Sequence, residues 1–90
     1  MEKTKLSGEE LMRLGTELYA AQIRDTVETQ ENENKICVVD VLSGDYEIDR
    51  TGVLAGARLR ERRPEGAFWG ERIGHPEGYT FGVSTRVAGK

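Results

Sequence analysis

The sequence has few of the residues that disulfides and metal sites require. Of its 90 residues, one is cysteine, one is histidine and two are proline. A single cysteine cannot form a disulfide within the chain, which favours a reducing compartment. Zinc sites use three or four protein ligands, so one Cys and one His are too few to predict a metal or a cofactor.

Long hydrophobic runs are also missing. No stretch approaches the roughly 20 apolar residues that cross a bilayer. The first residues, MEKTKLSGEEL, lack the apolar segment of a secretory signal. We therefore expect a cytoplasmic protein that does not interact with membranes.

The charge is uneven along the chain. Residues 1–45 contain 5 Lys/Arg and 10 Asp/Glu (net −5), and residues 46–90 contain 8 and 6 (net +2), which together give the formal net charge of −3. A general nucleic-acid binder would show a strong basic excess. The composition therefore argues against that class but leaves room for a local basic site.

The length predicts one domain, residues 1–90, with residues 1–6 and 84–90 frayed. A chain of this size buries only about 60–65% of the surface that its unfolded form exposes. Binding to a partner protein or to further copies of itself is a common way to supplement so thin a core.

A capping signature opens the first helix. Ser7 is followed three residues later by Glu10, and apolar residues then recur at spacings of three and four. This pattern predicts a helix from about Gly8 to Val27. The next stretch, ETQENENK, contains no apolar residue and predicts a solvated loop or a frayed helix end.

Strand patterns follow this loop. Residues 35–41 form a β-branched apolar run that is typical of a central strand buried on both faces. A turn at 43–45 and the alternating residues 46–48 complete a hairpin. Residues 67–73 and 79–83 predict two further strands.

A second helix lies between these strand pairs. Either Asp49 or Thr51 can cap it, and it is expected to run to about Arg62, before Pro64. The predicted fold class is α/β (α+β), in the order α-β-β-α-β-β, with the helices packed on the sheet. The helix permits a crossover that returns the third strand beside the first.

The segments GDYEI (44–48) and RIGH (72–75) are the most specific parts of a wider pattern over residues 17–82. This pattern resembles a family of short, uncharacterised bacterial proteins that are frequent in cyanobacteria. The resemblance implies no activity, but proteins of this size and distribution are similar to the antitoxin halves of toxin–antitoxin pairs. Gly52 and Gly56 depart from what a stable helix would contain.

The sharpest local charge feature is the run of arginines at 58, 60, 62 and 63. Arg58 and Arg62 are four residues apart and share a helix face. With Arg63, and with Arg72 if the fold brings it near, they could bind phosphates or the acidic residues of a protein. The alternative is a solvated helix end whose cations complement the helix dipole.

Aromatic residues concentrate in the last two strands. Phe68 and Trp69 are neighbours, so they point to opposite sides of the sheet. Either helices cover both sides, or Trp69 and Tyr79 mark an interface, because exposed aromatic residues often anchor partners.

The remaining candidates are isolated. His75 could act as a base or ligand, but no motif supplies a partner for it, so a structural turn residue is favoured. Cys37 lies in the most apolar strand and is expected in the core. The acidic residues at 40, 45, 47 and 49 crowd one hairpin, yet local roles explain them better than metal binding.

These patterns predict a small protein-interaction module, antitoxin-like or regulatory, rather than an enzyme. The expected interaction residues are Arg58, Arg62, Arg63, Trp69, Arg72, His75 and Tyr79. The alternative is nucleic-acid binding through the helix end at Arg58–Arg63, and a less favoured hypothesis is an enzyme centred on His75.

Overall fold

The computed structural model describes residues 6–75 and 80–84 and confirms the α+β class. Four strands form one sheet in the order β2-β1-β3-β4, and all neighbouring strands are antiparallel. The elements are α1 (Gly8–Leu18), a π-helical turn η1 (Tyr19–Ile23), α2 (Arg24–Val27), a 3₁₀ turn η2 (Gln30–Asn32), β1 (Ile36–Asp40), β2 (Tyr46–Asp49), α3 (Gly52–Arg62), β3 (Ala67–Arg72) and β4 (Thr80–Ser84).

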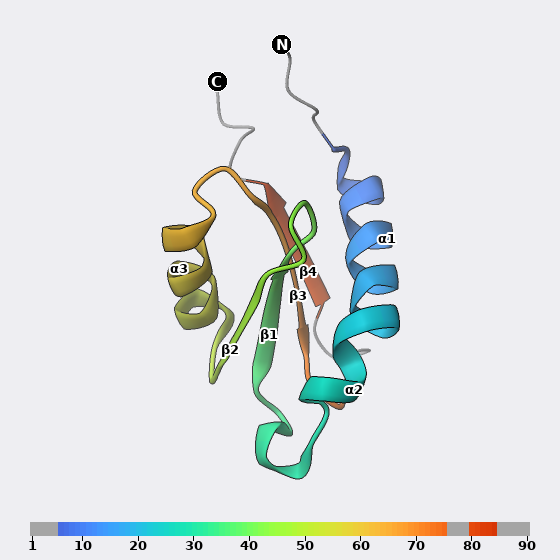
Figure 1. Ribbon diagram of the computed structural model, residues 1–90, viewed down its shortest axis with the longest axis vertical. Helices are drawn as coiled ribbons and strands as arrows, with labels where there is room; N and C mark the ends of the chain where they lie inside the picture. The colour runs from blue at the N-terminus through green and yellow to red at the C-terminus, as the bar shows by residue number, and fades with distance from the viewer. Residues whose placement is uncertain (1–5, 76–79, 85–90) are drawn as a thin grey trace.

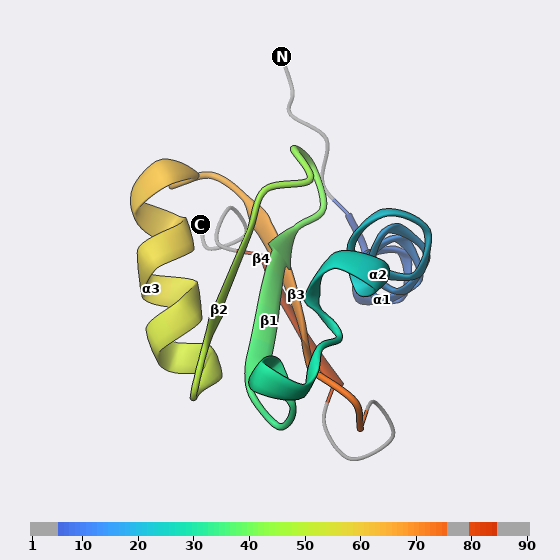
Figure 2. The same cartoon turned by 60° about the horizontal axis from the view of Figure 1, so that its bottom comes forward.

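Helices cover both faces of the sheet (Figures 1 and 2). The segment α1–η1–α2 lies on one face, where α1 contacts β3 and β4. On the opposite face α3 contacts β1 and β2. The two helical layers are therefore offset, and each packs mainly on a different half of the sheet.

The first helical segment begins and ends where the sequence predicts. The Glu10 N–H donates to the Ser7 Oγ at 3.0 Å, and the Ser7 N–H donates to the Glu10 Oε1 at 3.1 Å. Its buried residues recur every four positions, which drifts about 40° per step around an α-helix of 3.6 residues per turn. The π turn at Tyr19–Ile23 holds more residues per turn and counteracts this drift. The buried stripe is Leu11, Gly15, Tyr19, Ile23 and Val27.

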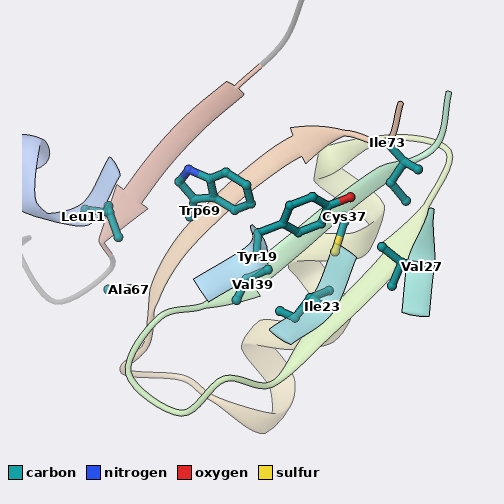
Figure 3. Close-up of a cluster of buried hydrophobic side chains, with 9 residues drawn as sticks. All are labelled: Leu11, Tyr19, Ile23, Val27, Cys37, Val39, Ala67, Trp69 and Ile73. Atoms are coloured by element: carbon teal, nitrogen blue, oxygen red, sulfur yellow. The ribbon is translucent and has the colours of Figure 1, made fainter. Parts of the chain in front are cut away.

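Trp69 belongs to the larger core cluster, on the α1 face, where its side chain lies next to Tyr19 (Figure 3). Its side chain is fully buried, and its ring lies 5.4 Å from that of Tyr19, centroid to centroid. The backbone of Gly15 approaches so closely that a Cβ there would lie 2.6 Å from the Trp69 Cβ. The cluster consists of Leu11, Tyr19, Ile23, Val27, Cys37, Val39, Ala67, Trp69 and Ile73.

A second, smaller core cluster lies under α3. Ala55 and Leu59 are its only buried helix residues, and they pack with Ile36, Val38 and Phe68 of the sheet. Strand β1 contributes to both clusters and is buried along its whole length, as the sequence predicts for a central strand.

The structure corrects the prediction that Trp69 is an interaction residue. Phe68 faces α3 and Trp69 faces α1, and both are buried because each face of the sheet carries a helix. The cap of α3 is also decided: the Leu54 N–H donates to the Thr51 Oγ1 at 3.2 Å.

Two residues of the predicted frayed ends lie in the described part of the chain. Leu6 packs against the larger core cluster, and Ser84 is the last residue of β4. The other residues of those ends lie outside the described part of the chain, as does Tyr79.

Candidate functional site

The arginines of α3 meet the acidic residues of the β1–β2 hairpin. The Arg62 Nε and Nη2 each donate to one oxygen of Asp45 at 2.9 Å, and its Nη1 lies 2.5 Å from the Glu47 Oε2. The Arg58 Nε bonds the Glu47 Oε1 at 3.1 Å, and its Nη1 lies 2.7 Å from the Asp49 Oδ2. The Arg63 Nε also reaches Asp45, at 3.2 Å. We call this group of six the arginine–carboxylate cluster.

The periodicities of the strand and of the helix bring the residues of the arginine–carboxylate cluster together. The acidic residues stand at every second position of the hairpin strand, so they share its α3 face. Arg58 and Arg62 stand one helical turn apart on the flank of α3 that faces β2. Three carboxylates therefore meet three guanidinium groups, and the local charge is balanced.

The same arginines also bind the backbone of β2. The Asp40 N–H donates to the Asp45 carbonyl, so this pair is hydrogen bonded, and the ladder alternates along the strand. The carbonyls of Tyr46 and Ile48 consequently point away from β1, toward the open edge of the sheet. Arg62 donates to the first carbonyl at 3.3 Å and Arg58 to the second at 3.0 Å. The cluster thereby covers the β2 edge.

The pKa values follow from these contacts. Hydrogen bonds from Arg62 lower the pKa of Asp45 from 3.8 to about 2. Hydrogen bonds from Arg62 and Arg58 also lower the pKa of Glu47. The carboxylates in turn raise the pKa of both arginines. All of these groups remain charged at neutral pH, and each satisfies an opposite charge inside the molecule.

The outer side of α3 carries exposed apolar residues. Val53 is 81% exposed and Leu54 is 41% exposed, although both are large hydrophobic side chains. Ala57 is exposed as well, and lies four and three residues after them on the same side. We call Val53, Leu54 and Ala57 the apolar α3 face. Arg58 borders it on one flank and Arg60, which lies over the Phe68 ring at 5.9 Å, on the other.

A shallow pocket of about 360 Å³ lies where the β1–β2 turn meets the end of α3. Its buried carboxylate, Asp40, accepts hydrogen bonds from the N–H of Leu42 and of Ala67 and from the hydroxyl of Ser43, at 2.7–3.3 Å. Asp40 therefore ties two loops together. The pocket is lined by Asp40, Leu42, Ser43, Arg62, Arg63, Pro64, Glu65 and Gly66.

His75 and Arg72 lie apart from the arginine–carboxylate cluster, where β3 ends near η2. The His75 Nε2 is 3.1 Å from the Glu33 Oε2, and both side chains are about half exposed. The Arg72 Nη1 donates to the Asn34 carbonyl at 3.4 Å. The structure thus brings these two predicted residues to one loop, around Glu33 and Asn34.

A polar group that the sequence did not reveal lies at the rim of the larger core. The Tyr19 hydroxyl donates to the Glu28 Oε2 at 3.1 Å, and the Arg24 guanidinium lies 5.5 Å from the Tyr19 ring centroid. Burial, reinforced by Glu28, raises the pKa of Tyr19. Burial, reinforced by Glu71, raises the pKa of Cys37 to about 12. At neutral pH a buried thiol with a raised pKa holds little of the thiolate, the nucleophilic form.

Comparisons with known proteins give no further guidance. The chain matches no family model, no curated protein and no solved structure. Within residues 6–75 and 80–84, no three His, Cys, Asp or Glu side chains are placed to hold a metal ion. In the same part of the chain, no helix has the length and apolar character to cross a membrane.

The arginine–carboxylate cluster was not predicted, because its acidic half lies in the β1–β2 hairpin and its basic half in α3. The pattern that could have revealed it is the match between acidic residues at 45, 47 and 49 and basic residues at 58, 62 and 63. A helix that follows a strand directly and packs on it brings such patterns together. No comparable pattern in the sequence predicts the burial of Glu71, which is only 4% exposed.

Proposed function

We propose that this chain is a small protein-interaction module that binds a partner protein through the apolar α3 face. The observation that carries the proposal is the exposure of Val53 and Leu54 on a helix whose flanks carry arginines. An apolar centre with a charged rim is the usual anatomy of a protein-binding surface. Arg58 and Arg60 supply such a rim.

The internal use of the arginines supports a protein partner over a nucleic acid. Phosphate groups would have to displace the carboxylates of Asp45 and Glu47 from Arg62. Little net positive charge would then remain for the phosphates, because the cluster is balanced. A partner with a shallow apolar groove requires no such displacement. The family that the sequence resembles is similar to antitoxins in size and distribution, which suggests a partner whose activity the module restrains.

Site-specific photo-crosslinking in cells tests this proposal. A photoreactive phenylalanine analogue at Val53 should give a discrete adduct with another protein. The same analogue at the exposed Thr26, on α2, should not give this adduct. Val53→Asp, tested against Thr26→Asp, should abolish co-purification of that partner while leaving the melting temperature nearly unchanged, since both side chains are exposed.

Three results would contradict the proposal. They are the absence of any adduct at Val53, an adduct that nuclease treatment removes, and an adduct with the mass of two copies of this chain. The second would favour nucleic-acid binding and the third self-association.

A further inference from the structure

The two edges of the sheet differ in how they are protected. At the β2 edge, arginines occupy the outward carbonyls of Tyr46 and Ile48. A second strand pairing at this edge would have to displace both guanidinium groups from these carbonyls. The β2 edge is therefore protected against self-pairing.

The β4 edge has hydrogen-bonding groups that point outward. The Ile73 N–H donates to the Lys35 carbonyl, and the Val41 N–H donates to the Ala67 carbonyl, so odd-numbered residues of β3 bond to β1. Even-numbered residues of β3 therefore bond to β4, through Phe81 and Val83. The N–H and C=O groups at positions 80, 82 and 84 are left facing away from the sheet.

The composition of β4 provides none of the usual protection of an edge strand. Its residues, Thr80-Phe81-Gly82-Val83-Ser84, include no charged residue and no proline. Natural edge strands commonly carry charges, prolines or bulges that prevent pairing with another chain. The contrast with the β2 edge of the same sheet is direct.

We propose that the β4 edges of two copies of this chain pair antiparallel about a twofold axis, which joins two four-stranded sheets into one. A register centred on Gly82 places Thr80 opposite Ser84 of the other copy, and Phe81 opposite Val83. All five positions then pair without placing any charge opposite a like charge. Aromatic with β-branched residues, and Thr with Ser, are favourable cross-strand combinations.

The structure at Gly82 suits the centre of this register. A Cβ at Gly82 would lie 3.0 Å from the Leu11 Cδ2 and the Met12 Sδ, so α1 lies close above the strand. Gly82 is nevertheless exposed, which leaves its backbone accessible to a second strand. Pairing through β4 uses a surface separate from the apolar α3 face, so this inference is independent of the proposed function.

Light scattering and disulfide trapping test the proposal. The protein should have twice the mass of the 10.1 kDa chain, at least at high concentration. Thr80→Cys and Ser84→Cys, expressed separately and mixed under mild oxidation, should form a disulfide-linked heterodimer. The reason is that a hydrogen-bonded antiparallel pair has a Cα–Cα distance of about 5.5 Å, within disulfide reach.

Matched controls make the register decisive. Each variant alone should not crosslink, because like positions lie about four residues apart along the paired strands. A mixture of Thr26→Cys with Ser84→Cys should also remain uncrosslinked, and the buried Cys37 adds no background. A monomer at every concentration without a trapped heterodimer, or crosslinking of Thr80→Cys alone as readily as the mixture, would overturn the proposal. Neither outcome depends on the partner of the α3 face.

Discussion

Replacing Gly15 by alanine tests how α1 is held on the sheet. Gly15 is buried in the middle of α1, and a Cβ at this position would lie 2.6 Å from the Trp69 Cβ and closer still to its ring. The Trp69 Cβ is fixed by the backbone of β3, so a rotamer change cannot relieve this contact. Either α1 moves away from the sheet or the core around Trp69 repacks.

Two opposing effects decide the magnitude. In a helix interior, alanine is more favourable than glycine by about 1 kcal/mol. An extra methyl group in a closely packed core costs about 1–3 kcal/mol, and the backbone contact here places Gly15 at the upper end. We expect Gly15→Ala to lower the free energy of unfolding by about 1–2 kcal/mol, which corresponds to about 4–8 °C in Tm for each kcal/mol.

Gly56→Ala is the matched control. Gly56 is also in a helix interior, but a Cβ there would contact nothing within 4 Å. This variant should therefore gain about 0.5–1 kcal/mol from helix propensity alone. Urea unfolding, with the slope compared between variants, measures both. Equal stabilisation by the two substitutions would refute the packing of Gly15 against Trp69.

Two further predictions concern titration. Hydrogen bonds from Arg62 lower the pKa of Asp45 to about 2, so their contribution to stability is complete above about pH 4 and is lost as the pH falls toward 2. In Arg62→Met the carboxyl titration of Asp45, followed by NMR, should return toward 3.8, and an unchanged titration would exclude the pair. Burial raises the pKa of Cys37 to about 12, so a thiol reagent at pH 8 should label the protein only as fast as it opens. Rapid labelling without urea would contradict this.

Local patterns predict much of this fold. The Ser7–Glu10 cap, the apolar stripe to Val27 and the buried run of β1 depend on neighbours within one element, and the structure agrees with each. The π turn at Tyr19–Ile23 was not predicted, because it adjusts the helix to a sheet that forms from distant residues.

The candidate site was less predictable because it depends on contacts between elements. The sequence shows that Phe68 and Trp69 point in opposite directions, but only the placement of a helix on each face buries both. From the sequence alone, the arginines are expected to form an available surface. In the structure α3 lies on β2, where Asp45 and Glu47 bind Arg62. The sequence shows the chemistry of each side chain, whereas the fold determines which side chains contact one another.

The two helical layers are attached to the sheet by different interactions, so we expect salt to affect their stability differently. Helix α1 is held by large apolar side chains around Trp69, whereas only Ala55 and Leu59 of α3 are buried, and ion pairs fasten its flank. Concentrated salt screens exposed ion pairs but strengthens apolar association when its anion is sulfate. Ammonium sulfate should therefore tighten the α1 layer while loosening the flank of α3, so that amide exchange separates the two helices into distinct cooperative units.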